Sequence, residues 1–373
     1  MAYAPPGTAR YDRCNTDTTM VIGRGLECSL TIRDDTMSRH HCKIRRQRNG
    51  YTIEDLDSKN GTFVDGRRIT EQIYLHHQAV IRLGRSILVF HAAPIDLSAE
   101  TQSDTFGLVG RFHASDVINQ LTQCNGSDCH ILLAGPTCSV KNLVSRAFAK
   151  MLGIPLLAHS ATEFASEQEA TAAIFGVEQR PWFIEQAARG VLLLDHASLL
   201  PNRVQKRLAE LMRTATFSRV GEKTTRTASA ILALASNQLP LTFVFKHGFL
   251  GLLRILSLPA LKYIKADIPD IFDHLLLREL EGIGYTGEPL PQLLSVYHYE
   301  QLMLDDFDQQ NVDGLVDLAG RIASQIDDGN EPAIATDSVF AKHFGTQHAT
   351  LQYPPVAPCA VRDTSDGWGN KAR

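Results

Sequence analysis

Three short clusters in the first quarter of the chain carry side chains that suit an anionic ligand. Gly23-Arg24 comes first, Ser38-Arg39-His40-His41 follows, and Asn60-Gly61 completes the series. Arginine offers a planar guanidinium that donates to two oxygens at once, and serine and asparagine add neutral hydrogen-bond donors. A phosphothreonine needs such donors from several loops, because it carries close to two negative charges and three acceptor oxygens. The pattern therefore indicates a site for a phosphorylated peptide.

Each of these residues also has an ordinary explanation when it is taken alone. Asn60-Gly61 is a common hairpin turn, Ser38 suits a turn, and Arg24 suits a solvated surface. The histidine pairs at 40–41 and 76–77 do not predict a metal site, because neighbouring residues of a strand point to opposite faces. The long and ordered series as a whole favours a site over these separate explanations.

The series Gly-Arg, Ser-Arg-x-His, Ser-x-Asn-Gly-Thr-Phe-Val-x-Gly and Ile-x-Leu-Gly runs from residue 23 to residue 84. It resembles the forkhead-associated (FHA) family of phosphothreonine readers. The resemblance implies that Arg24 and Ser38 contact the phosphate, with a further contact from Arg39. It also implies that Asn60 bonds the peptide backbone. Three more residues are implied to be structural: Gly23, His41 and Gly61.

Short apolar runs alternate with turn dipeptides as far as Phe90, and this predicts an all-β sandwich of Greek-key type over residues 1–92. The stretch before Gly23 is short for the family, which predicts a clipped first strand. The polar residues 93–106 are predicted to form a linker.

The period of the pattern changes from about Phe106. Strands of a parallel sheet are predicted where continuous apolar runs occur, at 130–134, 190–195 and 230–235. An amphipathic helix is predicted at 142–152, so residues 107–275 read as an α/β domain. Helical periodicity over 276–345 predicts a lid, and the polar residues 346–373 predict a flexible tail.

The region from Gly107 to Ala323 resembles the P-loop AAA+ domain of sigma-54-dependent transcription activators, in a degenerate form. Residues 135–142 take the Walker A position, where Cys138 and Val140 replace glycines and Lys141 is retained. Valine is poorly suited to a turn that needs glycine.

Other motifs of that family are altered as well. Asp195 keeps the magnesium-binding position of Walker B, but His196 replaces the glutamate that polarises water. Asn237 resembles the sensor I asparagine, and Asp313 replaces the sensor II arginine. Residues 179–182 leave no room for the loop that touches the sigma factor, and no helix-turn-helix pattern follows the lid.

The combination predicts a phosphothreonine-peptide-binding signalling adaptor with a pseudo-ATPase scaffold, with no catalytic residue, resident cofactor or direct DNA binding. Its expected partners are a phosphothreonine-containing protein, a Ser/Thr kinase and further copies of itself. The alternative is an ATP-binding sigma-54-type transcriptional regulator with an FHA sensor domain. In that case ATP and Mg²⁺ would be held by four residues: Gly135, Lys141, Asp195 and Asn237.

The composition limits the remaining possibilities. Residues 1–92 carry 14 Lys and Arg against 10 Asp and Glu, whereas the rest carries 23 against 31. A basic first part suits an anionic ligand, and an acidic remainder argues against general nucleic-acid binding. The seven cysteines form no CxxC pair, which favours free thiols in a reducing cytoplasm. No apolar stretch is long enough to predict a membrane span.

Overall fold

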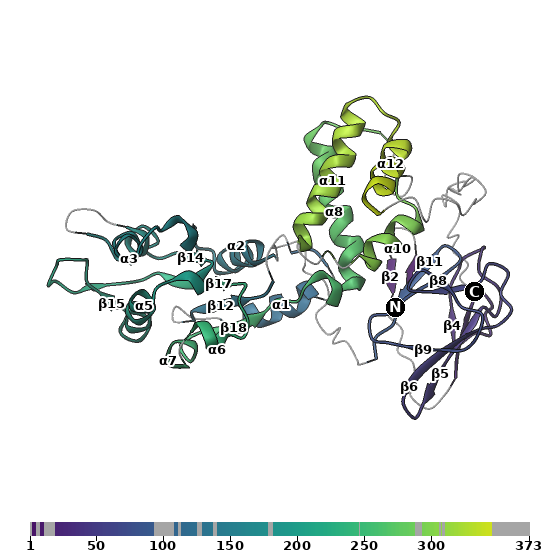
Figure 1. Cartoon of the computed structure of the whole chain (residues 1–373), viewed down its shortest axis with the longest axis horizontal. Coiled ribbons are helices and arrows are strands. Elements are labelled where there is room, and N and C mark those ends of the chain that lie inside the picture. Colours follow the sequence, from purple (N-terminus) through teal and green to yellow (C-terminus); the bar gives the residue numbers. More distant parts are fainter. Residues whose placement is uncertain are drawn as a thin grey trace, which may run out of the picture.

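The structure, a computed structural model, describes residues 2–4, 8–10, 19–92, 108–110, 113–124, 129–136, 140–177, 182–245, 247–287, 293–305, 307 and 310–344. The predicted linker (93–106) and tail (346–373) lie outside the described residues. Three parts follow one another in space, and a layer of helices separates a β-sandwich from an α/β domain (Figure 1).

Two sheets make up the sandwich. The first has the strand order β2-β1-β11-β10-β7-β8, and the second has the order β4-β3-β5-β6-β9. The first sheet consists of β1 (Ala2–Ala4), β2 (Thr8–Arg10), β7 (Thr62–Val64), β8 (Arg67–Arg68), β10 (Val80–Leu83) and β11 (Ser86–Val89). The second consists of β3 (Met20–Gly23), β4 (Leu30–Thr31), β5 (Cys42–Gln47), β6 (Gly50–Asp55) and β9 (Ile73–Leu75). The predicted all-β sandwich is confirmed.

The turn between β7 and β8 shows how local chemistry sets the register of these strands. Asp65 and Gly66 have φ angles of 48° and 76°. Two successive positive φ angles are typical of the tight turn that matches the twist of a hairpin. The first strand, β1, has only three residues and pairs antiparallel with β11.

The α/β domain is built on five parallel strands in the order β13-β14-β17-β12-β18. These are β12 (Ile131–Ala134), β13 (Leu156–Ser160), β14 (Val191–Asp195), β17 (Ile231–Ser236) and β18 (Arg254–Ser257). The three predicted strands are the three central ones, which are apolar on both faces. The edge strands β13 and β18 carry polar and exposed residues, so no continuous apolar run announced them.

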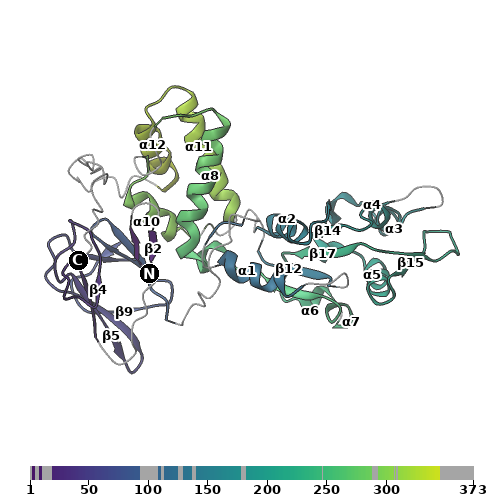
Figure 2. The same cartoon turned by 180° about the vertical axis from the view of Figure 1, so that it is seen from behind.

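Helices cover both faces of this sheet (Figure 2). One face packs on α1 (His113–Thr122) and α2 (Lys141–Leu152). The other packs on α3 (Glu167–Phe175), α4 (Phe183–Gln186) and α5 (Asn202–Thr214). Smaller elements complete the domain: β15 (Thr216–Phe217), β16 (Arg226–Thr227), α6 (Leu241–Val244), α7 (His247–Leu250) and short 3₁₀ turns at Ala161–Glu163 and Ala197–Leu199. Two further 3₁₀ turns, Leu261–Tyr263 and Lys265–Asp267, pack with the helical layer.

The helical layer consists of α8 (Ile268–Gly282), α10 (Val296–Leu304), α11 (Asn311–Asp327) and α12 (Pro332–Phe344). Because α8 begins at Ile268, the boundary predicted between residues 275 and 276 falls inside a helix. Throughout the described ranges, no helix is long and apolar enough to cross a membrane.

Strands β10 and β11 are buried on both of their faces. Ile81, Leu83 and Leu88 point into the sandwich core. Val80, Ile87 and Val89 point the other way and join the core of the helical layer. Figure 1 shows α10 beside β11, and the shared cluster of buried residues joins the sandwich and the helices in one apolar core.

Substitution of Ile87 tests this shared core. Ile87→Ala is expected to lower the free energy of unfolding by about 2–5 kcal/mol, because it leaves a cavity at a fully buried position. Equilibrium urea unfolding measures the effect. Tyr74→Ala, at a side chain on β9 that is 62% exposed, serves as the control and should change stability by about 0.5 kcal/mol or less. Equal effects of the two substitutions would contradict the shared core.

Candidate functional site

The loop after β3 lies directly against the loop before β5. The backbone N–H of Arg24 donates to the Ser38 carbonyl at 3.0 Å, and that of Gly25 donates to the Arg39 carbonyl at 3.0 Å. A Cβ atom on Gly23 would lie 2.0 Å from the Arg39 carbonyl oxygen, so only glycine permits this approach. The first two predicted clusters are therefore brought together.

The third cluster is held on the same loop. The Ser38 hydroxyl accepts a hydrogen bond from the backbone N–H of Lys59 at 3.0 Å. The Asn60 side-chain amide donates to the Thr36 carbonyl at 2.6 Å. The loops that carry Arg24, Ser38 and Asn60 thus lie side by side at one end of the sandwich.

His41 ties the loops together from below. It is fully buried, its Nδ1 accepts from the Ser38 backbone N–H at 3.1 Å, and its Nε2 lies 3.1 Å from the Gly61 carbonyl. Since a carbonyl only accepts, the ring is neutral with its proton on Nε2. Burial lowers the pKa of His41, although the bond to Gly61 and the charges of Asp55 and Asp34 oppose this in part.

Asp55 organises the turn that carries Asn60, and the sequence analysis missed it. Its carboxylate accepts from the Ser58 hydroxyl at 2.7 Å, the Ser58 N–H at 2.9 Å and the Thr62 hydroxyl at 2.5 Å. Burial raises the pKa of Asp55, but the bonds from Thr62 and Ser58 outweigh burial and leave the pKa lowered. The Ser58 hydroxyl in turn accepts from the Gly61 N–H at 3.0 Å. An aspartate three residues before a serine at a strand end was the available signal.

Asp34 is a buried carboxylate that the sequence did not point to. One oxygen accepts from the Thr36 N–H at 2.8 Å, and the other accepts from the Arg85 N–H at 2.7 Å and the Ser86 hydroxyl at 3.0 Å. These bonds fasten the Ser38 loop to the turn between β10 and β11. The backbone at the site is thereby fixed from two sides.

The surface of this site is positively charged. Arg24, Arg39 and Lys59 are exposed, and none of them forms an ion pair with a carboxylate in the part of the chain that the structure describes. Glu27, an acidic neighbour in the same loop, lies 3.3 Å from the His40 ring. Exposed cations beside fixed neutral donors suit a doubly charged phosphate group.

The second group of predicted residues lies at the carboxyl edge of the parallel sheet. Gly135 follows β12, Asp195 ends β14 and Asn237 follows β17, and these three strands are neighbours. Ligands of open α/β sheets bind at this edge. The middle of the expected Walker A loop, residues 137–139 with Cys138, lies outside the described residues.

Lys141 begins α2 and points back into the loop. Its ammonium is buried and donates to the carbonyls of Pro136 at 2.6 Å and Gly135 at 3.3 Å. Val140, at the start of this helix, gives no side-chain hydrogen bond to its first turn.

His196 lies between the Asp195 carboxylate, 3.7 Å from its ring Nδ1, and Ser160. Its N–H donates to Asp195 Oδ1 at 2.7 Å, and its ring Nδ1 lies 3.2 Å from the Ser160 hydroxyl. The residue adopts a left-handed backbone with φ of 51°. Asp313 is exposed at the start of α11. Asp195 is therefore the acidic residue of this motif, with no carboxylate at the water-polarising position beside it.

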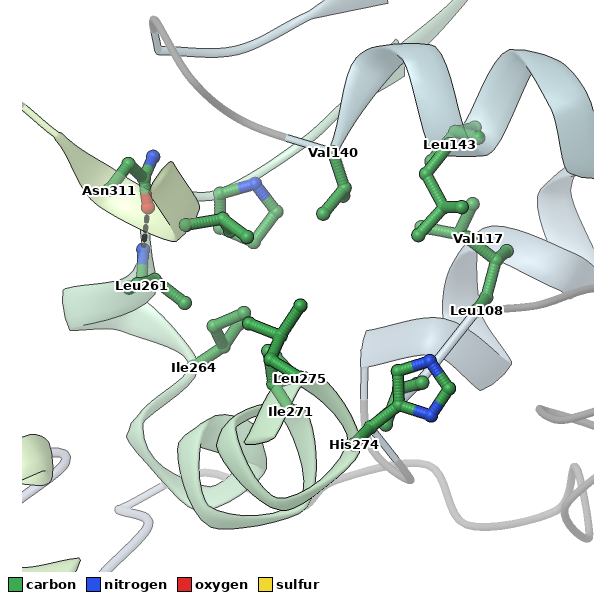
Figure 3. A pocket seen from close by; sticks show the side chains of 14 residues that line it. Leu108, Val117, Val140, Leu143, Leu261, Ile264, Ile271, His274, Leu275 and Asn311 are labelled. Atoms are coloured by element: carbon green, nitrogen blue, oxygen red, sulfur yellow. Dashed lines mark hydrogen bonds between the residues drawn. The ribbon is translucent and has the colours of Figure 1, made fainter. Parts of the chain in front are cut away.

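An apolar cavity of about 80 Å³ lies between the α/β domain and the helical layer (Figure 3). One wall belongs to the α/β domain: Leu108, Val117, Val140, Leu143 and Val144. The other belongs to the helical side: Leu261, Ile264, Ile271, His274, Leu275, Asn311 and Val312. The Asn311 side-chain oxygen accepts from the Leu261 N–H at 3.0 Å and braces this second wall.

Two family models match the chain. The one described as FHA domain matches residues 20–84, and the one described as Sigma-54 interaction domain matches residues 109–254. The chain therefore carries an FHA domain followed by a Sigma-54 interaction domain, as the resemblance implied.

Individual proteins match parts of the chain. The FHA domain-containing protein FhaB of Mycolicibacterium smegmatis is 29% identical over 69 residues, which are 18% of this chain and 44% of that protein. The C4-dicarboxylate transport transcriptional regulatory protein DctD of Rhizobium meliloti is 26% identical over 228 residues, which are 56% of this chain and 50% of that protein. The chain thus spans half or less of the length of these two relatives.

A solved structure agrees on the fold. NtrX from Brucella abortus, in complex with ADP, matches with a TM-score of 0.51 at 19% identity, over 61% of this chain and 53% of NtrX. At that identity the likeness shows the fold alone, and it confirms the predicted AAA+-like α/β architecture.

The neutral state of His41 predicts a dependence of stability on pH. Because its pKa is lowered in the folded protein, the unfolded chain takes up the proton first as the pH falls. The stabilisation is complete above about pH 6.5 and declines below it, by at most about 1.4 kcal/mol per pH unit. Urea unfolding between pH 7.5 and about pH 5 measures this slope.

The matched control is His41→Gln, which cannot be protonated. Other histidines contribute too, since burial lowers the pKa of His91 to about 4. The difference between the two proteins therefore isolates His41. Identical slopes would contradict the buried neutral ring.

Proposed function

We propose that the chain is a phosphothreonine-dependent regulatory protein whose FHA domain binds a phosphorylated partner and whose Sigma-54 interaction domain acts as a scaffold. The convergence of Arg24, Ser38 and Asn60 at one end of the sandwich carries this proposal. A Ser/Thr kinase would supply the phosphate.

The hydrogen-bond pattern assigns a direction to each donor. The Ser38 hydroxyl accepts from the Lys59 N–H, so its own proton is left to donate to a phosphate oxygen. Arg24, whose backbone N–H bonds the Ser38 carbonyl and whose side chain is exposed, would supply the charge-assisted bond. Asn60 donates one amide proton to the Thr36 carbonyl, so its side-chain oxygen remains to accept from a peptide N–H.

The residues at the sheet edge do not fit a site that binds and hydrolyses a magnesium nucleotide. Lys141 is engaged with loop carbonyls, and His196 is bonded to Ser160 where a carboxylate base is needed. We therefore derive no catalytic step at this edge. A scaffold role, with self-association of copies through this domain, suits the retained fold.

A second candidate is an ATP-binding regulator with an FHA sensor, and the apolar cavity favours it. Its walls suit a flat base, and Lys141 directly follows Val140, one of the residues that line it. NtrX, whose fold it shares, was solved with ADP, and DctD is described as a transcriptional regulatory protein.

Arg24→Ala tests the phosphate site. It is expected to weaken binding of a fluorescent phosphothreonine peptide by about 1.5–3 kcal/mol, which is about 10- to 150-fold, because a charge-assisted bond is lost. Fluorescence anisotropy measures the affinity.

Arg46→Ala, at an exposed arginine on β5, is the matched control and should bind as the unaltered protein does. The unphosphorylated peptide should not bind either protein. Equal affinities for the two peptides, or no loss with Arg24→Ala, would remove the proposed function.

Thermal unfolding with Mg-ATP separates the two candidates. The scaffold predicts an unchanged Tm at millimolar nucleotide, because the phosphate end is not built for it. If ATP binds, a concentration a hundred times its Kd would stabilise the protein by about 2.7 kcal/mol. A rise in Tm that Lys141→Ala abolishes would favour the ATP-binding regulator.

A further inference from the structure

Arg82 lies on the face of the sandwich that the helical layer covers. It is the cross-strand partner of Phe63 in the β7–β10 ladder. Its guanidinium carbon lies 3.8 Å from the centre of the Phe63 ring and 4.8 Å from that of Tyr297 on α10. Only 4% of Arg82 is exposed. This arginine is therefore clamped between a strand of the FHA domain and a helix of the lid.

Glu300 of α10 supplies the countercharge. Arg82 Nε donates to Glu300 Oε2 at 2.7 Å, and the glutamate is 6% exposed. Buried charges demand a partner in a defined geometry, and an apolar pair of similar volume would pack here at no greater cost. The ion pair thus fixes where β10 lies relative to α10, and the Phe63 ring stacked on the Arg82 guanidinium joins β7 to the same contact.

Strand β7 leads directly from the candidate phosphate site. The turn 58–61 runs without a break into β7, and Phe63 lies three residues after Asn60. The Thr62 hydroxyl bonds Asp55, and the Gly61 carbonyl bonds His41, so a displacement of β7 moves both anchors of the turn.

Further contacts fix the same junction. The Gln78 side-chain amide donates to the Tyr263 carbonyl at 2.8 Å, on the helical side. A Cβ on Gly66, in the turn after β7, would lie 3.0 Å from Leu304 of α10. Both ends of β7 are therefore fastened, one to the site and one to the lid.

We propose that Arg82 and Glu300 are positioning residues for phosphopeptide binding, through which the lid holds the Asn60 turn in its binding geometry. The inference rests on the proposed function of the FHA domain. Neither residue touches the peptide, because both are buried between the sandwich and the lid. The lid is then part of the phosphate reader.

Glu300→Gln in the full chain tests the pair, since it keeps the shape and removes the charge. The affinity for the phosphothreonine peptide is expected to fall about 3- to 30-fold, the range typical of residues that act through others. Glu281→Gln, at an exposed carboxylate of α8, is the matched control and should bind normally.

Amide hydrogen exchange separates positioning from general loss of stability. Faster exchange is expected over residues 58–64 in Glu300→Gln, with exchange over β5 and β6 unchanged. If the unaltered protein binds no phosphopeptide, the proposed function fails, and exchange over 58–64 still decides whether the pair holds the turn. The inference is overturned if exchange becomes faster across the whole sandwich, or if exchange over residues 58–64 does not change.

A second variant covers the case in which Glu300→Gln does not fold. Arg82→Met combined with Glu300→Leu replaces the pair by apolar side chains of similar size. It should fold and bind the peptide more weakly, because the geometry of β7 is no longer set by the charges. Folding with unaltered peptide affinity and unaltered exchange over 58–64 would overturn the inference.

Discussion

Burial of strands β10 and β11 on both faces is the constraint from which the rest of the arrangement follows. The side chains of Val80, Ile87 and Val89 point away from the sandwich core and pack in the helical core. The helices must therefore lie against β10 and β11, and the cavity on their opposite side faces the α/β domain. The FHA domain and the lid therefore pack as one body rather than as two domains joined only by a linker.

The phosphate site is organised by groups that a ligand would not touch. His41, Asp55 and Asp34 are the neutral ring and the two carboxylates that join four loops through side-chain to backbone bonds. They form hydrogen bonds with the buried N–H and carbonyl groups, so the exposed cations are not needed to hold the loops in place. Phosphopeptide binding, as proposed, would then need little ordering of the backbone, which would keep its entropic cost low.

The sequence predicts what depends on local chemistry and misses what depends on distant partners. Gly23, Asn60 and the apolar runs of β12, β14 and β17 follow from turn geometry and burial, and the structure places them as expected. Arg82 gave no signal, because an arginine in a strand reads as exposed until Glu300, more than two hundred residues later, is placed beside it. The apolar residues on both sides of Arg82 in the strand, Val80, Ile81 and Leu83, were the available sign that both faces of β10 are covered.

The covered face has a consequence for the sandwich as a separate piece. Proteolytic release from the helices would leave an aliphatic stripe and an uncompensated guanidinium in water, next to strand edges that invite self-pairing. Such a fragment would tend to self-associate. In this chain the FHA domain is consequently not a portable unit that recombination can graft elsewhere without also carrying α10 or an equivalent cover.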